Sequence, residues 1–136
     1  MFEFHGWAVI HYHPHDTNSV KQDQCWLLLE NYIDLLSTHL IQTQRHNGCD
    51  SVLIAGQHNH RNNYVIDLFK WIAENAPGSY GILYVHDDED SKRGYDFTNE
   101  FRVWKLCRGI LIEQQDPFLS PCIPIVEDPY NSNRDD

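Results

Sequence analysis

The sequence predicts an α+β domain with a single mixed β-sheet and two helices packed on one of its faces. Three observations support this class. Residues 2–13 alternate apolar and polar side chains, as a half-buried strand does. Residues 20–44 repeat apolar side chains at spacings of three and four, which is typical of an amphipathic helix. The rest of the chain alternates apolar segments with turn residues, and the expected order is β-α-β-α-β-β-β.

The first predicted strand separates its side chains into two sets. The apolar set is Phe2, Phe4, Ala8, Ile10 and Tyr12, and the polar set is Glu3, His5, Trp7, His11 and His13. Gly6 interrupts the apolar set, and a glycine inside a strand often marks a bulge or a close backbone approach. We expect function on the polar face, where Trp7 lies among histidines.

The predicted long helix, residues 20–44, is capped by Asn18 or Ser19 and ends before Asn47-Gly48. Residues 51–56 form a short apolar run, which is typical of a strand buried on both faces. Because the helix is long enough for a crossover, this strand is expected to run parallel to the first. A second helix is predicted over residues 63–75.

The C-terminal half is expected to form a meander. Residues 79–86, 99–108 and 110–113 read as strands, and a charged loop follows the first of them. The proline-rich residues 116–124 are expected to be extended. Residues 1–129 then form one domain, and residues 130–136 form a frayed polar tail.

The composition limits the choice of partners. Ten Lys and Arg residues oppose twenty Asp and Glu residues, so the net charge is −10. Such a charge disfavours direct binding to nucleic acid and attracts basic partners. No apolar run approaches the ~20 residues of a membrane span, and no secretory signal is visible, so a cytoplasmic location away from membranes is expected. The four widely spaced cysteines are expected to be mostly buried thiols.

Two groups of histidines could point to a metal or catalytic site. His11, His13 and His15 alternate along the first segment, and His58 and His60 flank Asn59. Imidazoles are common metal ligands, but neither group has a carboxylate or thiolate at a familiar ligand spacing. We therefore predict no catalytic residue, metal or cofactor. A small metal-binding or hydrolytic enzyme that uses these histidines is the alternative function.

The acidic run Asp87-Asp88-Glu89-Asp90 is the strongest charge feature. A solvated turn is the usual explanation, and the calcium-loop pattern is missing. The run could also dock a basic partner, because Tyr95 follows closely and aromatic residues are frequent at interface hot spots.

Short motifs in order along the whole chain resemble those of one protein family. They are Phe4-His5-Gly6-Trp7-Ala8-Val9-Ile10, Asn59-His60-Arg61, Val85-His86-Asp87-Asp88-Glu89, residues 104–109, and the tail 116–124 with Glu127-Asp128. The family consists of bacterial immunity proteins and is the seventh numbered family of polymorphic toxin systems.

The resemblance implies a binding role without catalysis. Such a protein is encoded beside a toxin and neutralises it in the cytoplasm, so the implied partner is the C-terminal domain of a cognate toxin. The tryptophan and arginine stressed for the family fall on Trp7, Arg61 and, less directly, Arg108. The histidines of residues 11–15 lie outside the motifs. A general interaction module without a toxin partner is a further alternative.

The predicted binding residues combine charge with aromatic anchors. They are Asp87, Asp88, Glu89, Asp90, Tyr95, Trp7 and Trp104. The motif residues expected to be structural or to bind are His5, Gly6, Asn59, His60, Arg61 and Arg108. Many toxins of these systems are nucleases with basic sites, which an acidic protein could cover, while buried aromatic side chains slow release.

Overall fold

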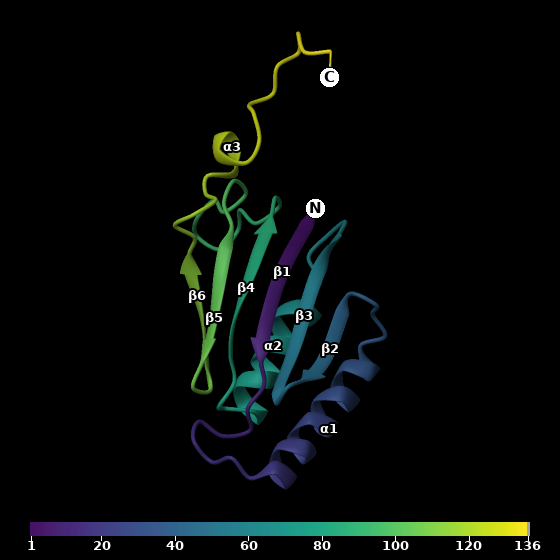
Figure 1. Cartoon of the computed structure of the whole chain (residues 1–136). Helices are drawn as coiled ribbons and strands as arrows, with labels where there is room; N and C mark the ends of the chain where they lie inside the picture. The colour runs from purple at the N-terminus through teal and green to yellow at the C-terminus, as the bar shows by residue number, and fades with distance from the viewer. Residues whose placement is uncertain (136) are drawn as a thin grey trace.

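The computed structural model describes residues 1–135 and shows one six-stranded sheet in the order β2-β3-β1-β4-β5-β6 (Figure 1). The strands are β1 (Phe2–Val9), β2 (Ile41–His46), β3 (Cys49–His58), β4 (Tyr80–Asp87), β5 (Arg102–Cys107) and β6 (Ile110–Gln115). The helices are α1 (Ser19–Leu35), α2 (Tyr64–Asn75) and the short α3 (Cys122–Ile125). The predicted α+β class, single sheet and two long helices are confirmed.

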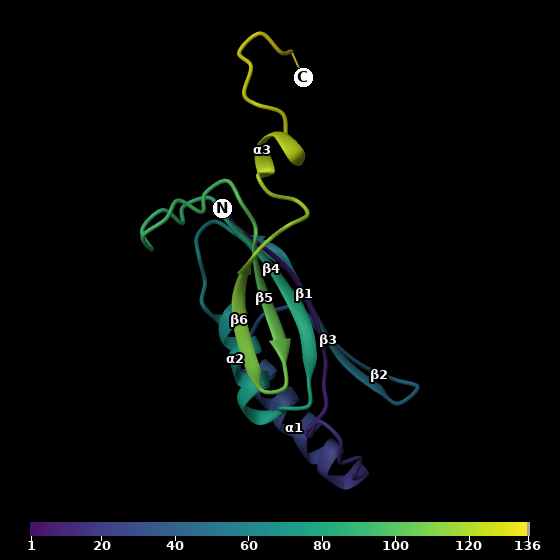
Figure 2. The same ribbon diagram turned by 90° about the vertical axis from the view of Figure 1, so that its left-hand side faces the viewer.

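The core lies between the two long helices and one face of the sheet. Seen from its edge, the sheet has α2 on one side, with α1 next to it, and no helix on the other (Figure 2). The segment after β6 reaches that other face at Tyr84, whose hydroxyl donates to Asp116 Oδ1 at 3.2 Å. Phe2, Phe4 and Ala8 of β1 are fully buried on the helix side, as the alternation predicted. They pack with Leu29 of α1 and Phe69 of α2 in one hydrophobic cluster. The other face of the sheet, which carries Trp7, is called the open face below.

The predicted mixed sheet is wrong, because all five strand pairs are antiparallel. Helix α1 ends at Leu35, well before residue 44, and the chain turns through Ser37, whose φ is positive at 52°. The next residues form the edge strand β2. Asn47 and Gly48, with φ of 51° and 74°, join β2 to β3 as a hairpin turn instead of ending a helix. This extra strand brings the chain back beside β1 in the antiparallel direction.

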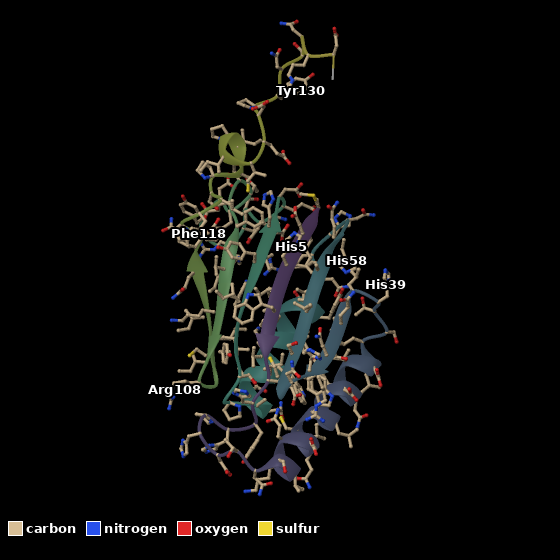
Figure 3. All side chains as sticks on the ribbon, in the orientation of Figure 1. His5, His39, His58, Arg108, Phe118 and Tyr130 are labelled. Atoms are coloured by element: carbon tan, nitrogen blue, oxygen red, sulfur yellow. The ribbon has the colours of Figure 1, made fainter. Side chains whose placement is uncertain are left out.

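Several segments near the ends differ from the predictions. The first strand ends at Val9, well before residue 13. Helix α3 begins at Cys122, within the residues 116–124 that were predicted to be extended. The tail projects beyond the sheet (Figure 1), and its exposed Tyr130 lies far from the strands (Figure 3). Asp136, the end of the predicted frayed tail, lies outside the described residues. No helix within residues 1–135 is long and apolar enough to cross a bilayer.

All four cysteines are free thiols, as expected, but only half of them are buried. Cys25 and Cys122 lie in the interior, whereas Cys49 and Cys107 are exposed at strand ends. The prediction of mostly buried thiols is therefore wrong for Cys49 and Cys107. Both lie on β-hairpins, where alternation along the strand turns their side chains away from the helices.

Candidate functional site

The acidic run lies at the end of β4, and each of its four carboxylates is paired within the protein. Arg61 Nη1 lies 3.1 Å from Asp87 Oδ2, and Arg93 Nη2 lies 2.8 Å from Asp90 Oδ2. The Met1 amino group lies 2.7 Å from Asp88 Oδ1, and His60 Nδ1 lies 2.7 Å from Glu89 Oε1. Asp87 and Asp90 are buried, whereas Asp88 and Glu89 are exposed. Only the last two therefore present carboxylates at the surface of this run.

Two arginines tie the acidic loop to strands β5 and β6. Arg93 donates to both oxygens of Glu113 at 2.7 and 2.6 Å, and Arg102 Nε donates to Glu113 Oε1 at 3.0 Å. These bonds, above all those from Arg93, lower the pKa of the Glu113 carboxyl. Both guanidinium groups also cover the ring of Phe97, at 4.8 and 4.3 Å. The loop is thus held by charge-assisted hydrogen bonds on both sides.

The motif Asn59-His60-Arg61 connects the end of β3 to this acidic corner. Arg61 reaches Asp87 and lies 5.6 Å from the ring of Phe2, so its side chain braces the first and fourth strands. The hydrogen bond from His60 lowers the pKa of the exposed Glu89 carboxyl. Asn59 is exposed. Arg61 and His60 therefore have contacts that account for them within the fold.

Two other motif positions have clear backbone roles. A β-carbon at Gly6 would lie 2.8 Å from Leu83 Cδ1 and 3.1 Å from Phe69 Cζ, so β1 and α2 pack closely at this point. Arg108 and Gly109 form the β5–β6 turn, with positive φ of 50° and 76°. The Arg108 side chain is exposed.

The structure does not bring the predicted binding residues onto one surface. Trp7 lies on the open face. Trp104 pairs with Leu83 and packs against the core on the helix side, and Tyr95 is exposed in the acidic loop, 5.0 Å from Phe97. Figure 2 shows this loop on the helix side of the sheet. The sheet therefore separates Trp7 from the acidic run.

The open face carries exposed apolar residues that the sequence pattern does not indicate as a binding surface. Trp7 stands between Leu53 of β3 and Ile82 of β4, and its ring meets that of Tyr80 edge-on at 6.1 Å. Trp7, Leu53 and Tyr80 are 42%, 47% and 45% exposed. Leu53 was missed because residues 51–56 were expected to be buried on both faces. The exposure of one face of β3 follows from its place in the sheet beside β1, which the sequence alone does not show.

A hollow of about 610 Å³ opens beside Trp7 on this face. Its lining includes His5, Leu53, Ala55, Tyr84 and, from the segment before β2, His39. Figure 3 shows His5 and His39 with β3 between them. Ala55 pairs with His5 across the strands, and its small side chain leaves space at the base of the hollow. The hollow can therefore receive a side chain of another molecule.

The two histidine groups lie at opposite ends of the sheet and have local partners. His13 Nδ1 accepts the N–H groups of His15 and Asp16, at 3.3 and 3.0 Å, and His58 hydrogen-bonds Tyr64 at 2.8 Å. Within residues 1–135, the His, Cys, Asp and Glu side chains placed closely enough to share one ion are Asp87, Asp88 and Glu89. That group contains no histidine, and each member has the partner named above. The geometry thus gives the histidine groups no common site.

The comparisons with known proteins give one result. Neither the curated proteins nor the solved structures contain a match to this chain. The family model described as Immunity protein 7 matches residues 1–128, which include every strand and helix of the fold. The members of that family are immunity proteins, a class consistent with toxin neutralisation and with a role that is not enzymatic. The chain belongs to the Immunity protein 7 family.

Proposed function

We propose that this protein binds the C-terminal domain of a cognate bacterial toxin in the cytoplasm and neutralises it without catalysis. The observation that supports this function is the family match over residues 1–128. A net charge of −10 fits a toxin with a basic surface, such as a nuclease, because an acidic inhibitor competes with nucleic acid for such a site. Long-range attraction would speed the encounter.

The structure suggests which acids can steer the toxin. Asp88 and Glu89 are exposed, and Tyr95 stands nearby in the same loop. Asp87 and Asp90 are buried in ion pairs, so their loss would disturb the fold before it reported on binding. We propose Asp88 and Glu89 as the steering charges of this loop.

Calorimetric titration with the C-terminal domain of the toxin encoded beside this gene tests the function. We expect tight one-to-one binding that weakens as salt rises, because salt screens the attraction between exposed charges. The purified toxin domain should lose its activity in the same proportion. Absence of binding at micromolar concentrations would contradict the proposal.

Stopped-flow association tests the steering charges. The double variant Asp88→Lys/Glu89→Lys should associate more slowly, with a flatter salt dependence. Asp34→Lys/Glu74→Lys on the exposed sides of α1 and α2 is the control, because it changes net charge equally. Equal slowing in both variants would show that net charge matters and the loop does not.

The alternative of a metal-binding or hydrolytic enzyme has its own test. Metal analysis of the purified protein should show no stoichiometric ion. Bound zinc lost in His58→Ala or His60→Ala would favour that alternative.

A further inference from the structure

We propose that the toxin docks on the open face of the sheet and places a side chain in the hollow beside Trp7. This inference rests on the immunity function proposed above and adds the surface through which it acts. Four properties of the face support it: its charge, its apolar exposure, its size and its shape.

The open face is nearly free of charge in a strongly charged protein. The strand register places alternate residues of all six strands on the side of Trp7. Among these strand residues, Glu3 and Lys105 are the only Asp, Glu, Lys or Arg side chains, although the chain has thirty (10 + 20). Glu3 is moreover hydrogen-bonded by His5 at 2.7 Å. The cores of protein interfaces show the same depletion of charge.

The same face exposes a row of three adjoining apolar residues, with a fourth beyond a lysine. Leu53, Trp7 and Ile82 are direct cross-strand neighbours, and Ile112 of β6 follows beyond Lys105. Leu53 and Ile112 are 47% and 44% exposed. Contiguous exposed apolar residues on a single face mark interaction sites more often than isolated ones do.

The face is large enough for a stable interface. Six strands spaced ~4.8 Å apart, with a rise of ~3.3 Å per residue over the six residues of the shorter strands, make a plane of roughly 500 Å². A standard interface buries about 800 Å² of accessible surface on each partner, and side chains add accessible area to a plane. One partner covering this face would therefore form an interface of standard size.

The shape of the hollow provides an anchor point. Its lining includes Trp7 and Leu53 from the strands and His39 and Leu40 from the segment before β2. The hollow shields an aromatic or arginine side chain from water on one side, and the docked partner would cover the other, which is the usual setting of an interface hot spot. Trp7 would contact this side chain with its exposed ring.

The charge of the whole protein favours a toxin domain over a second copy of this chain. Two copies on this face would bring together two molecules of net charge −10, which repel each other. A basic domain is attracted at long range by the net negative charge of the whole protein and meets a face with few charged side chains on contact. The expected toxin surface therefore has an apolar or aromatic centre within a basic surround.

Binding by two variants and a matched control tests the inference. We expect Trp7→Ala to weaken toxin binding at least tenfold through faster dissociation, and Leu53→Arg to weaken it a hundredfold or more. Leu28→Arg introduces the same change at an exposed leucine of α1 and should bind like the wild type. Thermal unfolding of each variant checks that the fold is kept.

Cys107 provides a second readout, because it is exposed on the open face, next to Tyr80 and Ile110. Saturating toxin should slow the alkylation of Cys107. If the wild type binds while both face variants bind within threefold of it and Cys107 stays reactive, the docking surface lies elsewhere and the immunity function stands. A wild type that does not bind would remove function and inference together.

Sedimentation of the free protein tests whether a second copy of this chain, and not the toxin, covers the open face. We expect a monomer. A dimer that Leu53→Arg dissociates would overturn the inference, because a second copy would then cover the open face.

Discussion

Gly6 shows how one residue sets the distance between the sheet and α2. An added methyl group would meet the ends of Leu83 and Phe69, which can move only by disturbing a filled core. Gly6→Ala should therefore lower the free energy of unfolding by about 1–3 kcal/mol. Urea denaturation measures this as a lower midpoint with an unchanged slope.

Gly81→Ala is the companion variant. Its β-carbon would meet the backbone carbonyl of Trp7, which cannot move without shifting a central strand. The loss of stability should exceed that of Gly6→Ala. Wild-type stability in both variants would mean that the strands and α2 pack less tightly than the structure shows.

Arg61 is expected to matter for stability more than for binding. Arg61→Ala leaves the buried Asp87 carboxylate without its guanidinium, at a cost of about 1–3 kcal/mol in unfolding free energy. Adding Asp87→Asn should recover part of this cost, because the unpaired charge is then removed. Chemical denaturation of the single and double variants measures the coupling. A variant that keeps full stability but loses toxin binding would instead place Arg61 in the interface.

At the scale of elements, the clearest patterns predicted the structure well. The second helix was expected over 63–75 and runs over Tyr64–Asn75, because its apolar stripe and its flanking turn residues agree. The alternation of β1 correctly predicted which side chains face the core. In both cases local periodicity and tertiary burial specify the same conformation.

The sequence does not predict strand β2, because the pattern of residues after α1 fits both a longer helix and a β-hairpin. Leu36, Leu40 and Ile41 continue the helical spacing of α1, so the sequence predicts a helix that is longer than the one in the structure. Asn47-Gly48 between alternating residues is a hairpin signal, but it resembles a helix stop equally well. Long-range packing decides, since Leu40 lies against Gly56 of β3. No local pattern contains that contact.

The link between the acidic loop and β6 should make stability depend on pH. Arg93 lowers the Glu113 pKa below its ordinary value of 4.5, so this stabilisation is complete above about pH 5 and is lost as pH falls through the lower, folded-state value. Glu113→Gln should cost about 1–2 kcal/mol near pH 7 and much less near pH 3. Urea unfolding at both pH values measures the difference.

Glu74→Gln on the exposed side of α2 is the control for this prediction. It should leave the pH dependence of unfolding unchanged. If Glu113→Gln also follows the wild-type curve, Arg93 does not stabilise the ionised carboxylate in solution.

At the scale of the whole molecule, we expect the C-terminal segment to divide into a part that the fold needs and a part that it does not. Asp116 accepts N–H groups of Phe118 and Leu119, and Ser120 Oγ accepts the N–H of Phe101 at 2.9 Å. Deleting residues 129–136 should therefore change the melting temperature little, whereas deleting 117–136 should lower it strongly. Thermal unfolding of both truncations measures where the domain ends. A large loss in the shorter truncation would place the boundary further along the chain.

The candidate site was predictable only in parts, for a reason that belongs to the whole molecule. Sequence alternation put Trp7 on the polar face of the first strand, and the acidic run was visible as charge. That the run lies on the other side of the sheet depends on strand order and pairing. The ion pairs of the acidic run could not be predicted either, because partners such as Arg61 and Asp87 are distant in sequence.

The alternation of β1 has a consequence for how this protein can diversify. Consecutive residues of the strand lie in different environments. Phe4 and Ala8 are buried in the core, whereas His5 and Trp7 are exposed to solvent. Substitutions at the odd-numbered positions can therefore accumulate while the folding determinants at the even-numbered ones stay intact. An inserted or deleted residue would exchange the two sets at once. Such a lineage can rewrite its exterior by point mutation, but not by changes of length within this strand.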